Sequence, residues 1–302
     1  MSEGAFVFGL ASLKNATAVF FNNNRGSSNM RAIARRRFIS LSLAACAAGI
    51  IASRARPGGI AYGKAPRQRL DVYAPESRIS TNHPVVVYFY GGGWQSGQRS
   101  ASRGVAKALA ARGIVTIAAD YRIYPETVFP GFLDDPAAAV RWTRDHVREF
   151  GGDSGRIFVM GHSSGAHMAA MLATDPRYLA AQGISNTSLA GMIGLAGPYA
   201  AIPTSDPHMD EIFPAALRER ALPIAFVTGN EPPMLLAAGT ADTDVDPRNS
   251  DRFADALRAH GDAVELKKYP GYGHDTIVDS FSGGQNTVSP VLADVTAFID
   301  AH

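Results

Sequence analysis

Short runs of consecutive apolar residues alternate between residues 69 and 301 with longer segments of helical period. The clearest run, Pro84–Tyr90, is rich in β-branched and aromatic residues and has no charged position. A strand with apolar side chains on both faces is typical of a parallel sheet that helices cover on both sides. The alternation therefore predicts an α/β fold with a mostly parallel central sheet.

The remaining elements follow from the same patterns. We expect strands at 69–73, 84–90, 114–119, 156–160, 189–195, 234–238 and 263–269, and helices at 102–112, 135–150, 164–173, 248–260 and 290–301. The segment 198–233 is rich in proline and has no clear period, so we expect it to leave the sheet as a small cap excursion above the sheet edge.

A pentapeptide between a predicted strand and a predicted helix, Gly161-His162-Ser163-Ser164-Gly165, has the pattern of a nucleophile turn. Such a turn lifts the hydroxyl of its central serine out of the sheet, and its glycines are needed because neighbouring backbone crowds it. The helix that follows directs N–H groups to the same place. The pattern favours Ser163 as a nucleophile, and an ordinary turn with serine as the helix N-cap is the alternative.

Three glycines, Gly91-Gly92-Gly93, follow the most hydrophobic predicted strand. Consecutive glycines let a loop bring backbone N–H groups close to a ligand, as the oxyanion formed in acyl transfer requires. A flexible turn is the alternative, and a phosphate-binding loop is disfavoured because its lysine-containing pattern is absent. Trp94 either forms a wall of an acyl pocket or covers the glycine loop.

His274 suits a general base best among the eight histidines. It follows a predicted strand inside a glycine-rich turn, whereas six of the others precede a strand, lie on helices, belong to the serine turn or end the chain. Asp242, Asp244 and Asp246 follow the preceding strand, and Asp242 is nearest to the strand end. We predict that Asp242 orients His274, and that the other two serve loop solvation or helix capping.

The order Ser, Asp, His along the chain is the α/β-hydrolase order. Residues 69–276 resemble the α/β-hydrolase carboxylesterases of the hormone-sensitive-lipase-like and feruloyl-esterase-like branches. The resemblance rests on the motifs LDVYAP, VVVYFYGGGW, DYRIYPE, FPGFLDD, RIFVMGHSSGAHMAA, PPMLLAAGTAD and YPGYGHD. The resemblance implies the α/β-hydrolase fold for the body of the chain.

The resemblance also implies roles for particular residues. By position, Ser163 resembles the nucleophile, Asp242 the acid and His274 the base, and the oxyanion hole corresponds to Gly92, Gly93 and the backbone of Ser164. One residue departs from the family pattern, because Tyr90 stands where a histidine is usual. That position supports the loop and carries no chemistry, so the departure concerns the geometry of the glycine loop.

These observations predict a metal-independent serine hydrolase without cofactor that cleaves carboxylic esters of small to medium acyl chain through an acyl-enzyme intermediate. The segment 198–233 and the residues leading into Tyr73 would roof the site. An arylformamidase similar to kynurenine formamidases, or another amide hydrolase, would use the same three residues. An exported binding protein on a hydrolase scaffold is the alternative outside enzymes, and the presence of all three residues disfavours it.

The charge of the chain is unevenly distributed. Residues 1–56 hold eight Lys or Arg and a single acid, whereas the rest of the chain holds 21 Lys or Arg and 26 Asp or Glu, a net charge of −5. A mildly acidic body gives no support to a nucleic-acid partner. The single cysteine, Cys46, excludes an internal disulfide and a cysteine-rich metal site.

The basic first part resembles an export leader. Arg35-Arg36-Arg37 precedes the apolar stretch Phe38–Ile51 and resembles the twin-arginine signal for the bacterial periplasm. We therefore expect residues 1–56 to be a leader and residues 57–302 to be the catalytic domain. If the leader does not function, the protein would be cytoplasmic.

Two features refine this expectation. Met30 is the more natural start of such a signal, because residues 1–29 do not have its layout. Leu43-Ala44-Ala45-Cys46 resembles a lipobox, so a lipid anchor at Cys46 is an alternative to transient membrane contact through the signal alone.

Overall fold

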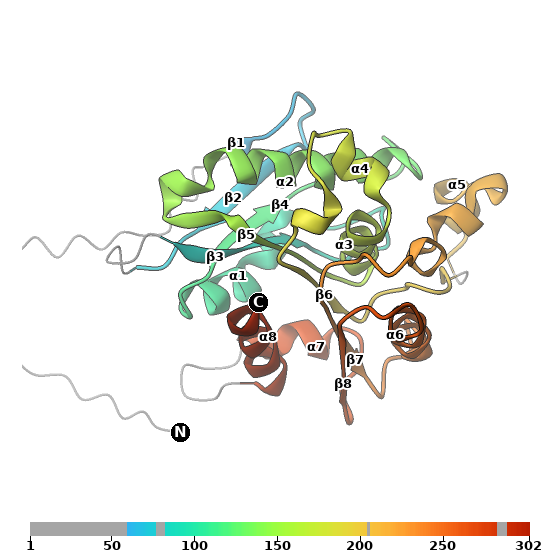
Figure 1. Cartoon of the computed structure of the whole chain (residues 1–302). Helices are drawn as coiled ribbons and strands as arrows, with labels where there is room; N and C mark the ends of the chain where they lie inside the picture. The colour runs from blue at the N-terminus through green and yellow to red at the C-terminus, as the bar shows by residue number, and fades with distance from the viewer. Residues whose placement is uncertain (1–58, 77–81, 204–205, 283–288) are drawn as a thin grey trace, which may run out of the picture. The chain divides into compact units, whose positions relative to one another are not determined.

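The computed structural model describes residues 59–76, 82–203, 206–282 and 289–302. In this part of the chain an eight-stranded sheet has the order β1-β2-β4-β3-β5-β6-β7-β8 (Figure 1). The strands are β1 (Ile60–Ala61), β2 (Arg69–Tyr73), β3 (His83–Phe89), β4 (Val115–Ala119), β5 (Gly152–His162), β6 (Gly191–Leu195), β7 (Met234–Gly239) and β8 (Val264–Tyr269). β2 is antiparallel to β1 and β4, and all other neighbours are parallel, so the predicted α/β-hydrolase fold is confirmed.

Helices cover both faces of this sheet (Figure 1). On one face lie α1 (Arg103–Ala110) and α8 (Pro290–Ala301), and on the other lie α2 (Asp134–His146), α3 (Ser164–Thr174) and α6 (Arg248–His260). The shorter helices are α4 (Pro176–Ala180), α5 (Met209–Ile212) and α7 (Thr276–Asp279). Among the described residues, none of the helices has both the length and the apolar character needed to cross a bilayer.

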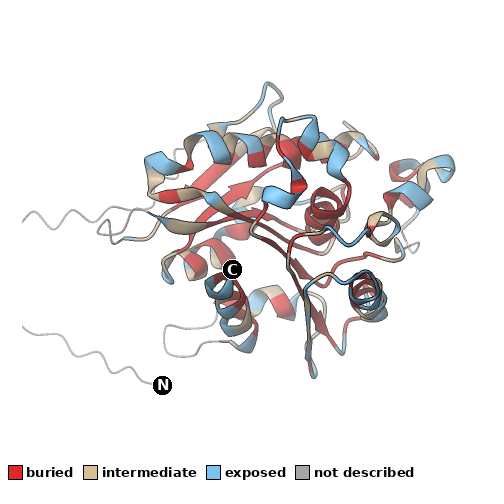
Figure 2. Cartoon of the chain, viewed as in Figure 1, coloured by how far each residue is buried: buried red, intermediate tan, exposed pale blue. Residues whose placement is uncertain are grey.

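The core is densest at the middle of the sheet, where Figure 2 shows buried residues along the strands and on the inner sides of the helices. Every residue of β4, β6 and β7 is buried, as the unbroken apolar runs predict. All eleven residues of α3 are also buried, because its alanines and methionines let it pack closely on the sheet. The helix that starts at the serine turn is therefore fixed on all sides.

The element boundaries differ from the sequence predictions by a few residues. β3 ends at Phe89 because the chain turns away at Tyr90, whose carbonyl accepts a hydrogen bond of 2.9 Å from the phenol of Tyr121. α2 ends at His146, and a 3-10 turn over Val147–Phe150 completes the predicted helix. β5 starts at Gly152, four residues earlier than predicted, and the short elements β1 and α4 were not predicted.

The proline-rich segment 198–233 consists, where described, of α5 and several 3-10 turns. Hydrogen bonds tie it to the body at several points; for example, Phe129 N–H donates to the carbonyl of Ile212 at 2.9 Å, and His167 Nε2–H donates to the carbonyl of Ala221 at 2.7 Å. The predicted leader, residues 1–56 with Cys46, lies outside the described residues.

Candidate active site

The predicted site residues lie on loops that leave the same edge of the sheet. Ser163 follows β5, Asp242 follows β7, His274 follows β8, and the glycine run follows β3. These four strands are parallel within the sheet, so their carboxyl ends meet at one edge. The fold thus brings Ser163 and His274 into contact although they are 111 positions apart in the chain.

The serine turn is strained and tightly enclosed. Ser163 has φ 53° and ψ −122°, a conformation that costs about 1–3 kcal/mol and persists only where surrounding structure holds it. A Cβ added at Gly161 would lie 2.2 Å from the carbonyl carbon of Gly165, and one added at Gly165 would lie 2.1 Å from the carbonyl oxygen of Phe89. The flanking glycines are therefore required by backbone contacts.

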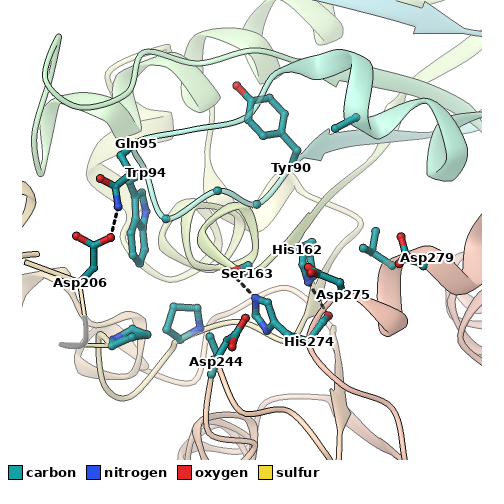
Figure 3. Close-up of a pocket in the computed structure, with 18 of the residues that line it drawn as sticks. Tyr90, Trp94, Gln95, His162, Ser163, Asp206, Asp244, His274, Asp275 and Asp279 are labelled. Atoms are coloured by element: carbon teal, nitrogen blue, oxygen red, sulfur yellow. Dashed lines mark hydrogen bonds between the residues drawn. The ribbon is translucent and has the colours of Figure 1, made fainter. Parts of the chain in front are cut away.

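A continuous hydrogen-bonded chain links the three predicted polar residues. Ser163 Oγ–H donates to His274 Nε2 at 2.8 Å (Figure 3), and His274 Nδ1–H donates to Asp242 Oδ2 at 2.8 Å. Asp242 is 8% exposed, and its Oδ1 accepts the N–H groups of Asp244 and Val245 at 2.9 Å each. The carboxylate is thus fixed by its own loop and directs its second oxygen at the imidazole.

The electrostatics of this pair favour a charged imidazole. Burial acts to lower the pKa of His274, but the hydrogen bond and the negative charge of Asp242 outweigh burial and raise the pKa. Burial acts to raise the pKa of Asp242, and its hydrogen bonds from His274 and Val245 outweigh that effect and lower the pKa. The arrangement therefore suits an imidazole that gains and loses a proton beside an ionised carboxylate.

The other two aspartates of this loop make different contacts. The carboxylate of Asp246 binds the backbone N–H and the guanidinium of Arg248, at the start of α6. Asp244 lines the pocket beside His274 (Figure 3). Among the described residues, only Asp242 of the three is hydrogen-bonded to His274.

The glycine loop packs against the serine turn. A Cβ at Gly91 would lie 2.9 Å from His162 Nδ1 and 3.0 Å from Ser163 Cβ. The N–H groups of Gly92 and Gly93 have no hydrogen-bond partner in the part of the chain that the structure describes. Ser164 is the first residue of α3, where an N–H has no partner inside the helix. These three donors remain available to a ligand.

A pocket of about 550 Å³ opens over Ser163. Figure 3 shows Gln95 and Asp206 at one end, Asp275 and Asp279 at the other, and Ser163 with His274 between them. Trp94 lines the pocket and is also buried against a cluster of rings; its ring neighbours are Phe132, His167 and Phe213.

His162 links the serine turn to the loop of the predicted base. Its Nε2–H donates to the carbonyl oxygen of His274 at 3.0 Å. Burial, and then the nearby His274, lower the pKa of His162 to about 4, so it stays neutral. From the sequence, His162 was expected only to shape the serine turn. Neither spacing nor motif shows which carbonyl oxygen will accept a hydrogen bond from a histidine.

Several pocket residues were not found from the sequence. Met209 and Asp206 come from the segment 198–233, and Val278 and Asp279 come from α7. They carry no motif, and only their place in the folded chain brings them to the pocket. The expectation that residues leading into Tyr73 roof the site was wrong, because none of the described residues before Tyr73 lines the pocket; Arg67 lies behind the glycine loop instead.

Fold and geometry together define an α/β hydrolase with a serine at its strand-to-helix turn. Comparison with protein families supports this class. The model of the prolyl oligopeptidase family matches residues 133–302, and that of the BD-FAE family matches residues 70–191.

Individual relatives are esterases by name. Esterase LipC of Mycobacterium tuberculosis is 32% identical over 237 residues, covering 71% of this chain and 58% of LipC. Carboxylesterase NlhH of the same organism is 33% identical over 221 residues, covering 65% of this chain and 67% of NlhH. The apo form of Thermogutta terrifontis esterase 2 superimposes with a TM-score of 0.69 at 27% identity, covering 81% of this chain and 95% of that chain.

The chain therefore belongs to the α/β-hydrolase carboxylesterases, as its motifs predicted. It spans about three fifths of the length of the first curated relatives that it matches.

Proposed function

We propose that the protein is a serine hydrolase that cleaves carboxylic esters through an acyl-enzyme intermediate, with Ser163, His274 and Asp242 as its catalytic triad. The observation that carries the proposal is the hydrogen-bonded chain from Ser163 through His274 to Asp242 at the floor of a pocket. The esterase names of its relatives support the same activity.

The first half of the reaction forms the acyl-enzyme. Ser163 Oγ attacks the ester carbonyl carbon while His274 Nε2 takes its proton. The carbonyl oxygen becomes an oxyanion, which the N–H groups of Gly92, Gly93 and Ser164 would bind. When the tetrahedral intermediate collapses, His274 returns the proton to the leaving alcohol oxygen and the ester C–O bond breaks.

The second half releases the acid. His274 takes a proton from a water molecule, whose oxygen attacks the acyl carbon. Collapse of this second intermediate breaks the bond to Ser163 Oγ, and His274 returns the proton to the serine. Throughout, Asp242 holds the imidazole with Nδ1 protonated and stabilises the imidazolium.

The size of the pocket supports small to medium acyl chains. A volume of about 550 Å³ lies within the usual range for small-molecule sites, which is roughly 300–1,000 Å³. Pro198, Pro203 and Met209 of the segment 198–233 line this pocket. A short roof of this kind leaves little apolar surface for a long lipid chain.

A second candidate is the hydrolysis of an amide bond, such as that of an arylformamide, by the same residues. The match to the prolyl oligopeptidase family over residues 133–302 favours it. A series of p-nitrophenyl esters of increasing chain length, measured beside an arylformamide, separates the two. We expect kcat/KM to be highest for a short ester, and a higher value for the arylformamide would reverse the assignment.

We further propose that residues 1–56 direct export to the bacterial periplasm by the twin-arginine route, on the evidence of their sequence alone. Replacing Arg35, Arg36 and Arg37 with lysine should retain the protein in the cytoplasm of a bacterial host. An unchanged periplasmic fraction would contradict this proposal, and mass analysis of the exported protein would show whether Cys46 carries a lipid.

A further inference from the structure

The glycine loop is held by hydrogen bonds inside the turn and by contacts from neighbouring segments. Ser96 N–H donates to the carbonyl oxygen of Gly92 at 2.9 Å, and Gln95 N–H donates to the same oxygen at 3.2 Å. Gly92 has φ +144°, and a Cβ there would lie 2.3 Å from the carbonyl oxygen of Ser96. The loop is therefore a rigid turn, and the remaining freedom is movement of the whole turn relative to Ser163.

The guanidinium of Arg67 supports both ends of this loop from outside. Its Nη2 donates to Tyr90 Oη at 2.8 Å and to the carbonyl oxygen of Gly97 at 2.7 Å. Its Nε donates to the carbonyl oxygen of Tyr121, just after β4, at 2.9 Å. Tyr90 and Gly97 are the residues at the two ends of the loop, so one planar group fixes both ends to the sheet.

Tyr90 connects this support to the loop. Its ring points away from Ser163 (Figure 3) and is stacked on Tyr121 with ring centroids 4.7 Å apart. The phenol of Tyr121 donates in turn to the carbonyl oxygen of Tyr90 at 2.9 Å. Burial raises the pKa of both tyrosines, so both phenols keep their protons. A tyrosine at this position thus offers an oxygen that an arginine can reach.

We propose that Arg67 is a positioning residue that, through Tyr90 and Gly97, holds the backbone donors of Gly92 and Gly93 at the distance the oxyanion requires. The inference rests on the proposed ester hydrolysis. Because the oxyanion exists only after attack on the carbonyl, displaced donors lower kcat and leave KM nearly unchanged. Removing a whole oxyanion donor costs roughly 10²–10³ in kcat, so we expect a loss of about 10–100-fold when the loop is only loosened.

The test compares Arg67→Met, which keeps the apolar stem of the side chain, with the wild type and with Arg69→Met as a matched control. Arg69 is two residues away on β2, and its hydrogen bond is to the carbonyl of Gly59, remote from the glycine loop. Tyr90→Phe removes only the phenol oxygen and should have an intermediate effect. Arg67→Lys should recover part of kcat, since an ammonium can reach one or two of the three acceptors.

Two measurements are made on each variant. The first is kcat and KM for p-nitrophenyl butyrate, and the second is hydrogen exchange of the peptide covering residues 91–97. We expect Arg67→Met to lower kcat at constant KM and to speed exchange in this peptide, with Arg69→Met unchanged in both. Near-wild-type kcat and exchange in Arg67→Met would overturn the inference.

The outcome also separates the inference from the proposed function. If the wild type hydrolysed no ester, the proposed function would fail, and the exchange comparison alone would still decide whether Arg67 holds the loop. If Arg67→Met raised KM without changing kcat, Arg67 would act in substrate binding and the inference would be wrong.

Discussion

The floor and the roof of the pocket are built in different ways. The floor consists of loops that leave parallel strands, and side-chain hydrogen bonds of 2.8 Å connect Ser163, His274 and Asp242 across them. The roof, the described part of segment 198–233, consists of α5 and 3-10 turns and meets the glycine loop through the hydrogen bond from Gln95 Nε2 to Asp206. From this difference we expect that the floor determines the reaction and that the roof influences which substrates bind.

The largest expected effect is at the centre of the floor. Ser163→Ala should lower kcat by about a millionfold, since no other group there supplies the nucleophilic oxygen. The control is Ser164→Ala, because the hydroxyl of Ser164 is buried and has no hydrogen-bond partner among the described residues. Steady-state hydrolysis of p-nitrophenyl butyrate measures both, and equal losses would contradict the assignment of the turn.

The next effect distinguishes two neighbouring carboxylates. Asp242→Asn should lower kcat by roughly 10⁴-fold, because the amide favours the wrong imidazole tautomer. Asp244→Asn should stay within about threefold of the wild type, since Asp242 and not Asp244 is hydrogen-bonded to His274. The melting temperature of each variant is the control for folding, and a reversed order of the two activities would refute the role of Asp242.

The roof should respond in selectivity. Met209 is buried and lines the pocket, so Met209→Ala should enlarge it and raise kcat/KM for an octanoate ester relative to an acetate ester by about tenfold. Ile212→Val, on the same short helix but outside the pocket lining, is the matched control. A loss of activity toward both esters alike would mean that the roof contributes to catalysis itself.

The pH dependence of kcat/KM should show the interaction between His274 and Asp242. His274 must be neutral to act as a base, and its pKa is raised above its usual value of 6.5, so activity should fall as the pH drops through a midpoint above 6.5. In Asp242→Asn the residual activity should have a lower midpoint, because the carboxylate that raises this pKa is gone. A midpoint below 6.5 in the wild type would contradict the claim that Asp242 raises the pKa of His274.

The smallest effect is expected far from the pocket. A chain that starts at Gly58 should fold and hydrolyse esters within about twofold of the full chain, because all residues that line the pocket lie at or after residue 88. Thermal unfolding and kcat/KM compare the two chains. Insolubility of the shorter chain alone would show that the first residues belong to the fold.

The sequence predicted the floor well because its signals are local and chemical. Unbroken apolar runs identify β3, β4 and β7, and crowding at Gly161 and Gly165 leaves few alternatives for the serine turn. The chain order of serine, aspartate and histidine then places each residue after its own strand.

The roof and the support of the glycine loop could not be predicted in the same way. Met209 reaches the pocket through a turn-rich segment with no period, and Arg67 meets Tyr90 only because β2 runs antiparallel beside β4. Such contacts depend on tertiary placement, and neither spacing nor residue type indicates them. In the sequence, Tyr90 stood out because it departs from the family pattern at the start of the glycine loop. The structure shows that Arg67 is the hydrogen-bond partner of its phenol oxygen.

The most direct test of the account is covalent labelling of the intact protein with a fluorophosphonate, followed by peptide mass analysis. The account predicts one adduct per chain, on Ser163, with ester hydrolysis lost in proportion to labelling, and no adduct in Ser163→Ala. An adduct on another residue, or full hydrolysis by a fully labelled protein, would contradict the claim that Ser163 is the nucleophile.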